Sequence, residues 1–125
     1  MMAFDAYKIL DEREAGSVID LIAPCMDDYL YIIDLKNDTL RISQSAVERF
    51  MLPDKFMNDA TKHLRTLVYE KDRKLLENHK RKIYDGKEKR YNVLCRLMNS
   101  KNLPVWINCR GEVINDEAGK PRYII

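Results

Sequence analysis

The sequence is poor in the residue types that build metal sites, disulfide frameworks and membrane spans. It contains three cysteines and two histidines among 125 residues. Cys25, Cys95 and Cys109 are odd in number, widely spaced and without a C-x-x-C pair, which argues against a zinc site or a disulfide framework. No apolar run approaches the ~20 residues that a membrane-spanning helix needs. We expect reduced cysteines, with Cys95 and Cys109 in the core.

The N-terminal residues do not have the pattern expected of a signal peptide, and the chain lacks a strong charge imbalance. Acidic side chains interrupt the N-terminal residues early, which excludes a signal peptide and favours a cytoplasmic location. Basic residues number 22 and acidic residues 20, so strong attraction to nucleic acid or to a membrane is not expected. Six basic residues are interleaved with acids and have no aromatic ladder, so we interpret them as a solvated face: Lys80, Arg81, Lys82, Lys87, Lys89 and Arg90.

What is present is enough for one globular domain. The chain is 46% hydrophobic and 34% charged, which is typical of a soluble protein with a real core. Residues 91–125 predict three strands of an antiparallel meander, because apolar and polar residues alternate with the period of a half-buried strand. The residues expected on the inner face are Tyr91, Val93, Cys95, Leu97, Val105, Ile107, Cys109 and Val113, with Trp106, Asn108, Arg110 and Glu112 opposite.

The remaining elements follow from periodicity and turn residues. We expect a one-faced helix over 3–22, strands over 29–35 and 39–43, and further helices after Ser45, over 60–68 and over 72–84. Ser45 and Glu48 match a capping box, with the face of Val47, Phe50 and Met51 buried behind it. The inward stripe of the longest helix is predicted to be Leu75, Leu76, His79 and Ile83, and Gly86 is expected to cap its C-terminus.

The end of the chain, Tyr123-Ile124-Ile125, falls inside a predicted strand. Chain ends are usually solvated, so we expect a fragment of a longer protein. We divide it into an N-terminal flanking helix (1–23) and a folded domain (24–125) that is cut in or just after its last strand.

Several stretches resemble the PAS domain, a sensor module common in bacterial signalling proteins. They are D-D-Y-L-Y-I-I-D-L, S-A-V-E-R-F, V-Y-E-K-D-R and N-D-E-A-G-K-P-R-Y-I-I, in that order. In V-Y-E-K-D-R, the residues Glu70, Asp72 and Arg73 match the family's H-P-E-D-R turn, whereas Tyr69 and Lys71 depart from it. The segments D-L-K-N-D-T and S-A-V-E-R-F, in this order, are especially similar to those of PAS domains attached to GGDEF-type diguanylate cyclases.

The resemblance implies an α+β fold, with a five-stranded antiparallel sheet and helices packed on one face. It also implies a sensory role that modulates an attached output domain, a diguanylate cyclase or a histidine kinase. The chain itself has no GGDEF signature, Gly-rich phosphate loop or evident catalytic residues, so we expect no enzymatic activity from it. Ligand-free dimerisation and, more distantly, a small α+β enzyme are the alternatives.

A ligand pocket would lie between the sheet and the helices. Its predicted lining is Tyr31, Ile33, Phe50, Leu67, His79, Val93, Cys95, Leu97, Ile107 and Cys109. This mostly apolar set favours either a filled core or a small apolar metabolite. Asn108-Cys109-Arg110 resembles the flavin-reactive motif of light-sensing relatives, but it falls in a predicted strand rather than a helix, which argues against flavin. His79 is interpreted as a core histidine rather than a haem ligand.

A homodimer interface is the other candidate site. Apolar residues of the N-terminal helix and of the outer sheet face would form it, namely Phe4, Tyr7, Leu10, Val18, Ile22, Trp106 and Ile114. An exposed Trp beside apolar neighbours is a common interface anchor.

Overall fold

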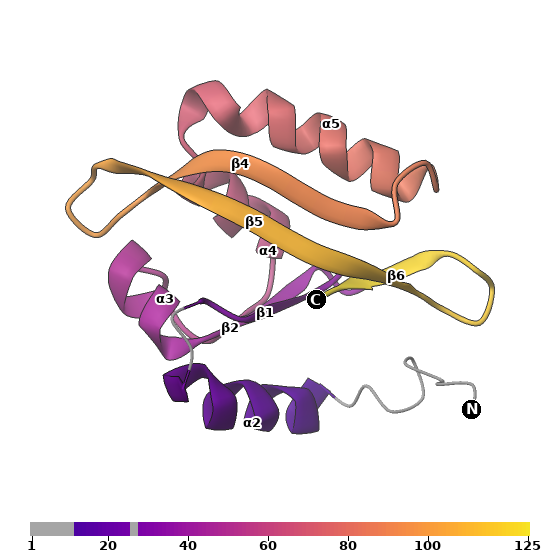
Figure 1. Cartoon of the computed structure of the whole chain (residues 1–125), viewed down its shortest axis with the longest axis horizontal. Coiled ribbons are helices and arrows are strands. Elements are labelled where there is room, and N and C mark those ends of the chain that lie inside the picture. The colour runs from indigo at the N-terminus through magenta and orange to yellow at the C-terminus, as the bar shows by residue number, and fades with distance from the viewer. Residues whose placement is uncertain (1–11, 26–27) are drawn as a thin grey trace.

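The computed structural model describes residues 12–25 and 28–125, which form one antiparallel sheet with helices on both sides (Figure 1). The helices are α2 (Glu12–Ile22), α3 (Gln44–Phe50), α4 (Ala60–Leu67) and α5 (Arg73–Tyr84), with 3-10 turns at η1 (Ala23–Cys25) and η2 (Glu70–Asp72). The strands are β1 (Tyr31–Asp34), β2 (Thr39–Ile42), β3 (Phe56–Met57), β4 (Arg90–Met98), β5 (Pro104–Asn115) and β6 (Pro121–Ile124). The α+β prediction is confirmed, with β3 as a short sixth strand.

The last strand lies in the middle of the sheet. The strand order is β3-β2-β1-β6-β5-β4, so β6 joins the N-terminal strands to the long β4–β5 hairpin. Ile124 lies opposite Ile33 of β1 on one side and Val113 of β5 on the other. The β4–β5 register runs from Arg90–Glu112 to Met98–Pro104. This register places the predicted inner residues of the meander on one face, which confirms the alternation.

Helices α3, α4 and α5 cover the inner face of the sheet. One apolar cluster is built on Leu40, Met57 and Ala60. A second is built on Ala46, Phe50 and Leu67, with Leu97 and Ile107 of the hairpin packed against it. Burial of these apolar side chains is the main source of stability for such a layer.

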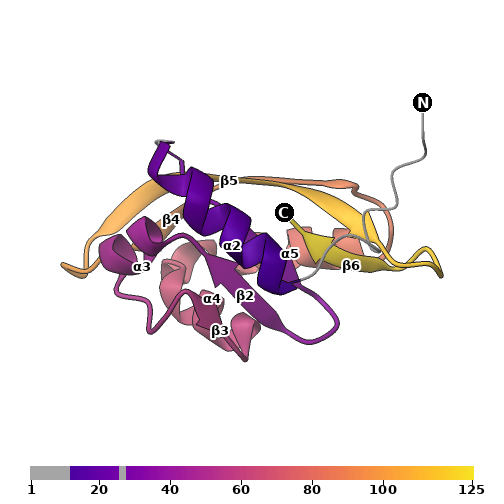
Figure 2. The ribbon, with the colours of Figure 1, turned by 90° about the horizontal axis from the view of Figure 1, so that it is seen from below.

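Helix α2 covers the outer face, on the side of the sheet opposite α5 (Figures 1 and 2). Its buried residue Ile19 packs on Ile32 and Tyr123. Gly16 is also buried, because a Cβ at this position would lie 2.7 Å from Nη1 of Arg41 on β2. The missing side chain therefore allows the helix to approach the sheet closely. Gly16, which interrupts the predicted apolar stripe, is thus a contact point.

The predicted single apolar stripe of the N-terminal helix is wrong in the described part. Val18 and Ile22 are 53% and 41% exposed, and only their neighbour Ile19 faces the sheet. The predicted stripe residues Phe4, Tyr7 and Leu10 lie outside the described residues. Helix α2 consequently has apolar side chains on two faces, a pattern that a single buried face does not require.

Helix α3 begins earlier than the predicted capping box requires. Its N-cap is Ser43, whose N–H bonds the carbonyl of Leu30 and so holds this residue at the end of β2. Ser45 therefore lies inside the helix, and Glu48 accepts a hydrogen bond from Nε2 of Gln44 (3.4 Å). Within the described residues Ser43 makes no side-chain cap, so the capping-box prediction is wrong.

Two further side chains differ from the expected burial. Met51 was expected inside, but its left-handed backbone (φ 52°) directs it outward and it is 73% exposed. Leu75 is 45% exposed because the inward line of α5 runs through Leu76, His79 and Ile83, the last fully buried. The predicted cap at Gly86 is confirmed by its positive φ of 73°. No helix in the described ranges is long and apolar enough to cross a membrane.

Candidate functional site

The predicted pocket residues lie on the inner face, where polar groups gather between α5 and the β4–β5 hairpin. The imidazole of His79 meets the ring of Tyr91 edge-on, with 6.1 Å between ring centres. The sulfur atoms of Cys95 and Cys109 are 3.8 Å apart. The hydroxyl of Tyr31 donates to the backbone carbonyl of Arg110 on β5 (2.8 Å). Four elements, α5, β4, β5 and β1, therefore bring imidazole, thiol and phenol groups to one side of the sheet.

These groups influence one another electrostatically. A hydrogen bond links the thiols of Cys95 and Cys109, and it lowers the pKa of Cys109 and, with burial, raises the pKa of Cys95. Burial raises the pKa of Tyr31 and of Tyr91 well above the usual range, and the neighbouring Cys109 raises both further. Both phenols are therefore neutral at physiological pH, and Cys109 is the more readily ionised thiol of the pair.

The imidazole of His79 has a nitrogen with no partner. Its Nδ1 atom is buried and makes no hydrogen bond to any described residue. Buried polar atoms are normally paired, because leaving one unpaired costs about 1–3 kcal/mol. The ring therefore has one hydrogen-bonding position that no described residue occupies.

The remaining predicted pocket residues belong to apolar packing. Phe50, Leu67, Leu97 and Ile107 meet in one cluster, and Ile33 packs with the neighbouring one. Val93 is also buried, and in the sequence it lies between Tyr91 and Cys95. Tyr91 is absent from the predicted pocket lining, although its alternation with Val93 and Cys95 in the sequence is the signal that could have found it.

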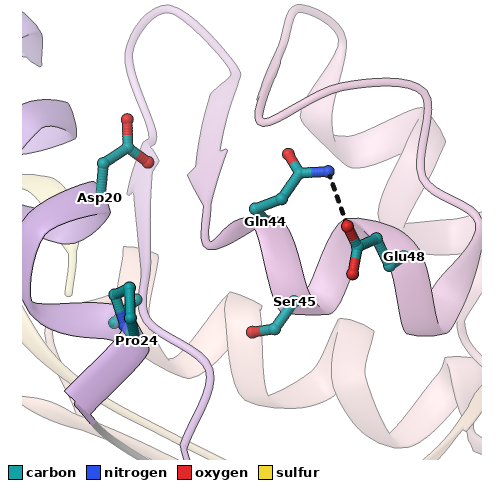
Figure 3. A pocket seen from close by; sticks show the side chains of 6 residues that line it. Asp20, Pro24, Gln44, Ser45 and Glu48 are labelled. Atoms are coloured by element: carbon teal, nitrogen blue, oxygen red, sulfur yellow. Dashed lines mark hydrogen bonds between the residues drawn. The ribbon is translucent and has the colours of Figure 1, made fainter.

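Two hollows lie elsewhere, against α2. One, of about 330 Å³, lies between the end of α2 and α3 and is lined by Asp20, Ala23, Pro24, Gln44, Ser45 and Glu48. Figure 3 shows Asp20 and Pro24 on one side of it, with Gln44, Ser45 and Glu48 on the other. The second, of about 140 Å³, surrounds the contact of Gly16 with Arg41. Asp20 borders both hollows and pairs with Lys55 (3.2 Å). None of the ten predicted pocket residues lines either of these two hollows.

The predicted interface residues in the described part of the chain differ in exposure. Trp106 is 60% exposed on the outer face of β5, and Leu94 of β4 is exposed on the same face. Helix α2 adds Val18 and Ile22, together with Leu21, its most exposed apolar residue. Ile114 is instead half-buried against the cluster of Ile19, Ile32 and Tyr123.

Comparisons with known proteins agree with this architecture. No protein-family model and no curated protein matches the sequence. A sensory box histidine kinase/response regulator from Burkholderia thailandensis E264 is similar over 83% of this chain and 76% of its own, with a TM-score of 0.64 and 15% identity. A domain described as that of a light and redox sensing histidine kinase from Haloarcula marismortui is similar over 91% and 93%, with a TM-score of 0.61 and 18% identity. At these identities the likeness establishes the fold.

Proposed function

The chain has the fold of PAS-type sensor domains, and from this premise we propose that it is a sensory and regulatory domain of a bacterial signal-transduction protein. It binds a small ligand or a partner and thereby biases an attached output domain. The size of such a bias equals the difference in binding free energy between two arrangements of the domain.

The output domain that the sequence favours is a diguanylate cyclase, because of the resemblance around D-L-K-N-D-T and S-A-V-E-R-F. A histidine kinase is the alternative, favoured by the names of the two structural neighbours. Measuring cyclic di-GMP synthesis and autophosphorylation in the parent protein separates the two, since each activity belongs to one of them only.

The ligand we propose is a small, mainly apolar metabolite with one polar group. The observation that carries this proposal is the buried Nδ1 of His79, which has no partner among the described residues and whose ring meets Tyr91. Tyr91 in turn lies near the Cys95–Cys109 pair. Apolar walls with a few placed polar groups are typical of small-molecule sites. The polar group of the ligand would pair with His79, and its apolar part would lie against the inner strands.

Native mass spectrometry of the protein purified from cells tests the ligand. We expect a retained small molecule in the wild type and in His63→Leu, and its loss in His79→Leu. A compound supplied at 100 times its Kd should stabilise the wild type by about 2.7 kcal/mol in a thermal-shift screen. A protein that retains nothing and shows no shift across a metabolite panel contradicts the proposal. A strong Soret band on addition of haemin would show that the ligand is haem rather than an apolar metabolite.

The second function we propose is homodimerisation through the outer face. The supporting observation is that α2 exposes Val18, Leu21 and Ile22 while burying Ile19 against its own sheet. Trp106 and Leu94 expose further apolar area on the neighbouring strands. Exposed apolar area of this kind, with an aromatic anchor, is typical of protein interfaces.

Sedimentation equilibrium with one matched pair of variants tests the dimer. Leu21→Asp places a charge in the proposed interface, whereas Leu75→Asp places one on an exposed leucine of α5, across the sheet. We expect Leu21→Asp to weaken self-association about tenfold or more, which corresponds to 1.4 kcal/mol, and Leu75→Asp to leave it unchanged. A wild type that is monomeric at high concentration contradicts dimerisation and leaves ligand binding to be judged separately.

A further inference from the structure

The carboxylate of Asp72 occupies a helix-capping position but does not cap the helix. Asp72 precedes the first residue of α5, where an Asp side chain normally accepts a hydrogen bond from the helix backbone. In the described structure its two oxygens instead accept three hydrogen bonds from Arg96 of β4. These come from the backbone N (2.8 Å), Nε (2.9 Å) and Nη2 (2.7 Å). The pair thus fixes the start of α5 to a particular residue of the sheet.

The same guanidinium lies between two aromatic rings. Its central carbon is 4.5 Å from the ring centre of Tyr69 and 4.7 Å from that of Trp106. Arg96 and Trp106 are direct partners in the β4–β5 register, so both leave the sheet on its outer face. Arg96 therefore reaches round the β4 edge of the sheet, with its carboxylate partner at α5 and an aromatic partner on the outer surface. Arg is suited to this role because its planar group forms a forked ion pair and stacks on aromatic rings at the same time.

The backbone reinforces this connection. The N–H of Tyr69 bonds the carbonyl of Arg96 (2.8 Å), and Val68 forms an isolated bridge with Leu97. The segment from Val68 to Asp72 therefore lies along the outer edge of β4 and leads directly into α5. The inward-facing His79 lies seven positions after Asp72, which is about two helical turns.

We propose that Arg96, held by Asp72, is the positioning residue for Trp106, and that it couples α5 on the inner face to the outer surface around Trp106. This inference rests on the proposed function, because the outer surface is the proposed dimer interface. A shift of α5 would move the carboxylate, the guanidinium would follow its forked ion pair, and the indole would lose or change its stacking partner. Changes at the inner face would then alter the surface that meets a second copy.

Trp106 is the single tryptophan of the chain, so its fluorescence reports this site alone. The informative variants are Asp72→Asn, which removes the charge of the carboxylate, and Arg96→Lys, which keeps a cation but loses the planar fork. Glu70→Gln is the matched control, because it removes a carboxylate from the same segment at an exposed position. We expect both informative variants to increase quenching of Trp106 by acrylamide and to weaken dimerisation about fivefold, the size expected for one stacked cation. The control should match the wild type.

Coupling to α5 is measured by a double-mutant cycle between His79→Leu and Arg96→Lys. We expect His79→Leu to change Trp106 quenching in the wild-type background and to have no effect in the Arg96→Lys background. Additive effects would overturn the coupling.

The proposal is also overturned if Asp72→Asn and Arg96→Lys keep native circular dichroism with wild-type quenching and wild-type self-association. If Asp72→Asn does not fold, Arg96→Lys decides in its place, because it retains both charges. If the protein never dimerises but the variants still alter quenching, the positioning of Trp106 is supported and the proposed dimer is contradicted. Failure of the positioning proposal is therefore distinguishable from failure of the proposed dimer.

Discussion

Asp34 at the end of β1 and Arg122 of β6 form a forked ion pair across 88 positions of sequence. Nε of Arg122 lies 3.0 Å from Oδ1 of Asp34, and Nη2 lies 3.1 Å from Oδ2. The same carboxylate accepts hydrogen bonds from the backbone N–H of Lys36 and of Asn37, so it also shapes the turn after β1. The side chain of Asp34 is 2% exposed. One carboxylate therefore fixes both the β1–β2 turn and the neighbouring central strand.

Replacing Asp34 by Ala should be strongly destabilising. The substitution removes the buried carboxylate from the forked ion pair with the half-buried Arg122, and removing one partner of such a pair typically costs about 3–5 kcal/mol. Urea unfolding monitored by circular dichroism measures the loss. The control is Glu112→Ala, which removes the exposed partner of Arg90 and should cost no more than about 1 kcal/mol. Equal losses in the two variants would show that the Asp34 pair has no special role.

A methyl group at Gly16 should loosen α2 from the sheet. Alanine would favour an isolated helix by about 1 kcal/mol, but here its Cβ would meet the guanidinium of Arg41. We expect Gly16→Ala to destabilise the protein by no more than about 1 kcal/mol, because the group that must move is the flexible end of Arg41 and the gain in helix propensity opposes the cost of overpacking. The double variant with Arg41→Ala should recover part of the loss. A Gly16→Ala protein that is more stable than wild type would contradict the close approach.

The Asp72–Arg96 pair should make stability depend on acidity in a defined direction. Hydrogen bonds from the Arg96 side chain and backbone lower the pKa of Asp72 in the folded state. A lowered folded-state pKa stabilises the protein above the unfolded pKa of about 3.9, and this contribution is lost as the pH falls through the folded-state value. Wild type should therefore exceed Asp72→Asn in stability at pH 7, and the difference should shrink below about pH 4. Unfolding curves at several pH values check this, and a constant difference would refute it.

The three thiols should react in a fixed order. Cys25 is exposed, Cys109 is half-buried and has a lowered pKa, and Cys95 is fully buried with a raised pKa. Because the thiolate is the reactive form, iodoacetamide should label Cys25 first, then Cys109, and Cys95 only on unfolding. Peptide mass spectrometry reads the order. Cys95→Ala should slow labelling of Cys109 by removing the hydrogen bond that lowers its pKa; faster labelling would mean that burial by Cys95 dominates.

The β4–β5 hairpin could be predicted from the sequence because its interactions are local. Two adjacent stretches alternate in phase and are joined by a turn, so the inner residues Val93, Cys95, Ile107 and Cys109 follow from the period alone. The candidate site was predictable to the same extent. Its inner-face residues were found, but the contact of His79 with Tyr91 depends on where α5 packs across the sheet, which no local pattern specifies.

The sequence-based predictions were wrong where the local structure depends on residues that are distant in the sequence. The start of α3 depends on the bond from Ser43 to Leu30, so a local capping pattern at Ser45 and Glu48 placed it wrongly. Two-residue strands such as β3 leave no periodic signal. Asp72 matched a family motif in the sequence, but its partner Arg96 lies on another element, so the pair could not be derived from spacing.

The central position of β6 has a consequence for the order of folding. In the described part of the chain, the β1–β2–β3 ribbon and the β4–β5 hairpin share no ladder, and they become one sheet only when β6 inserts between them. The pairing of Ile33 with Ile124 closes a very long loop, which is a slow step because its entropy is lost before the contacts form. During synthesis the β1–β2–β3 ribbon is complete at Met57, long before β6, whereas the β4–β5 hairpin ends at Asn115, just before β6 begins at Pro121. In a nascent chain the β1 edge therefore stays open until Pro121–Ile124 leaves the ribosome, and an open edge of this kind is a site of aggregation.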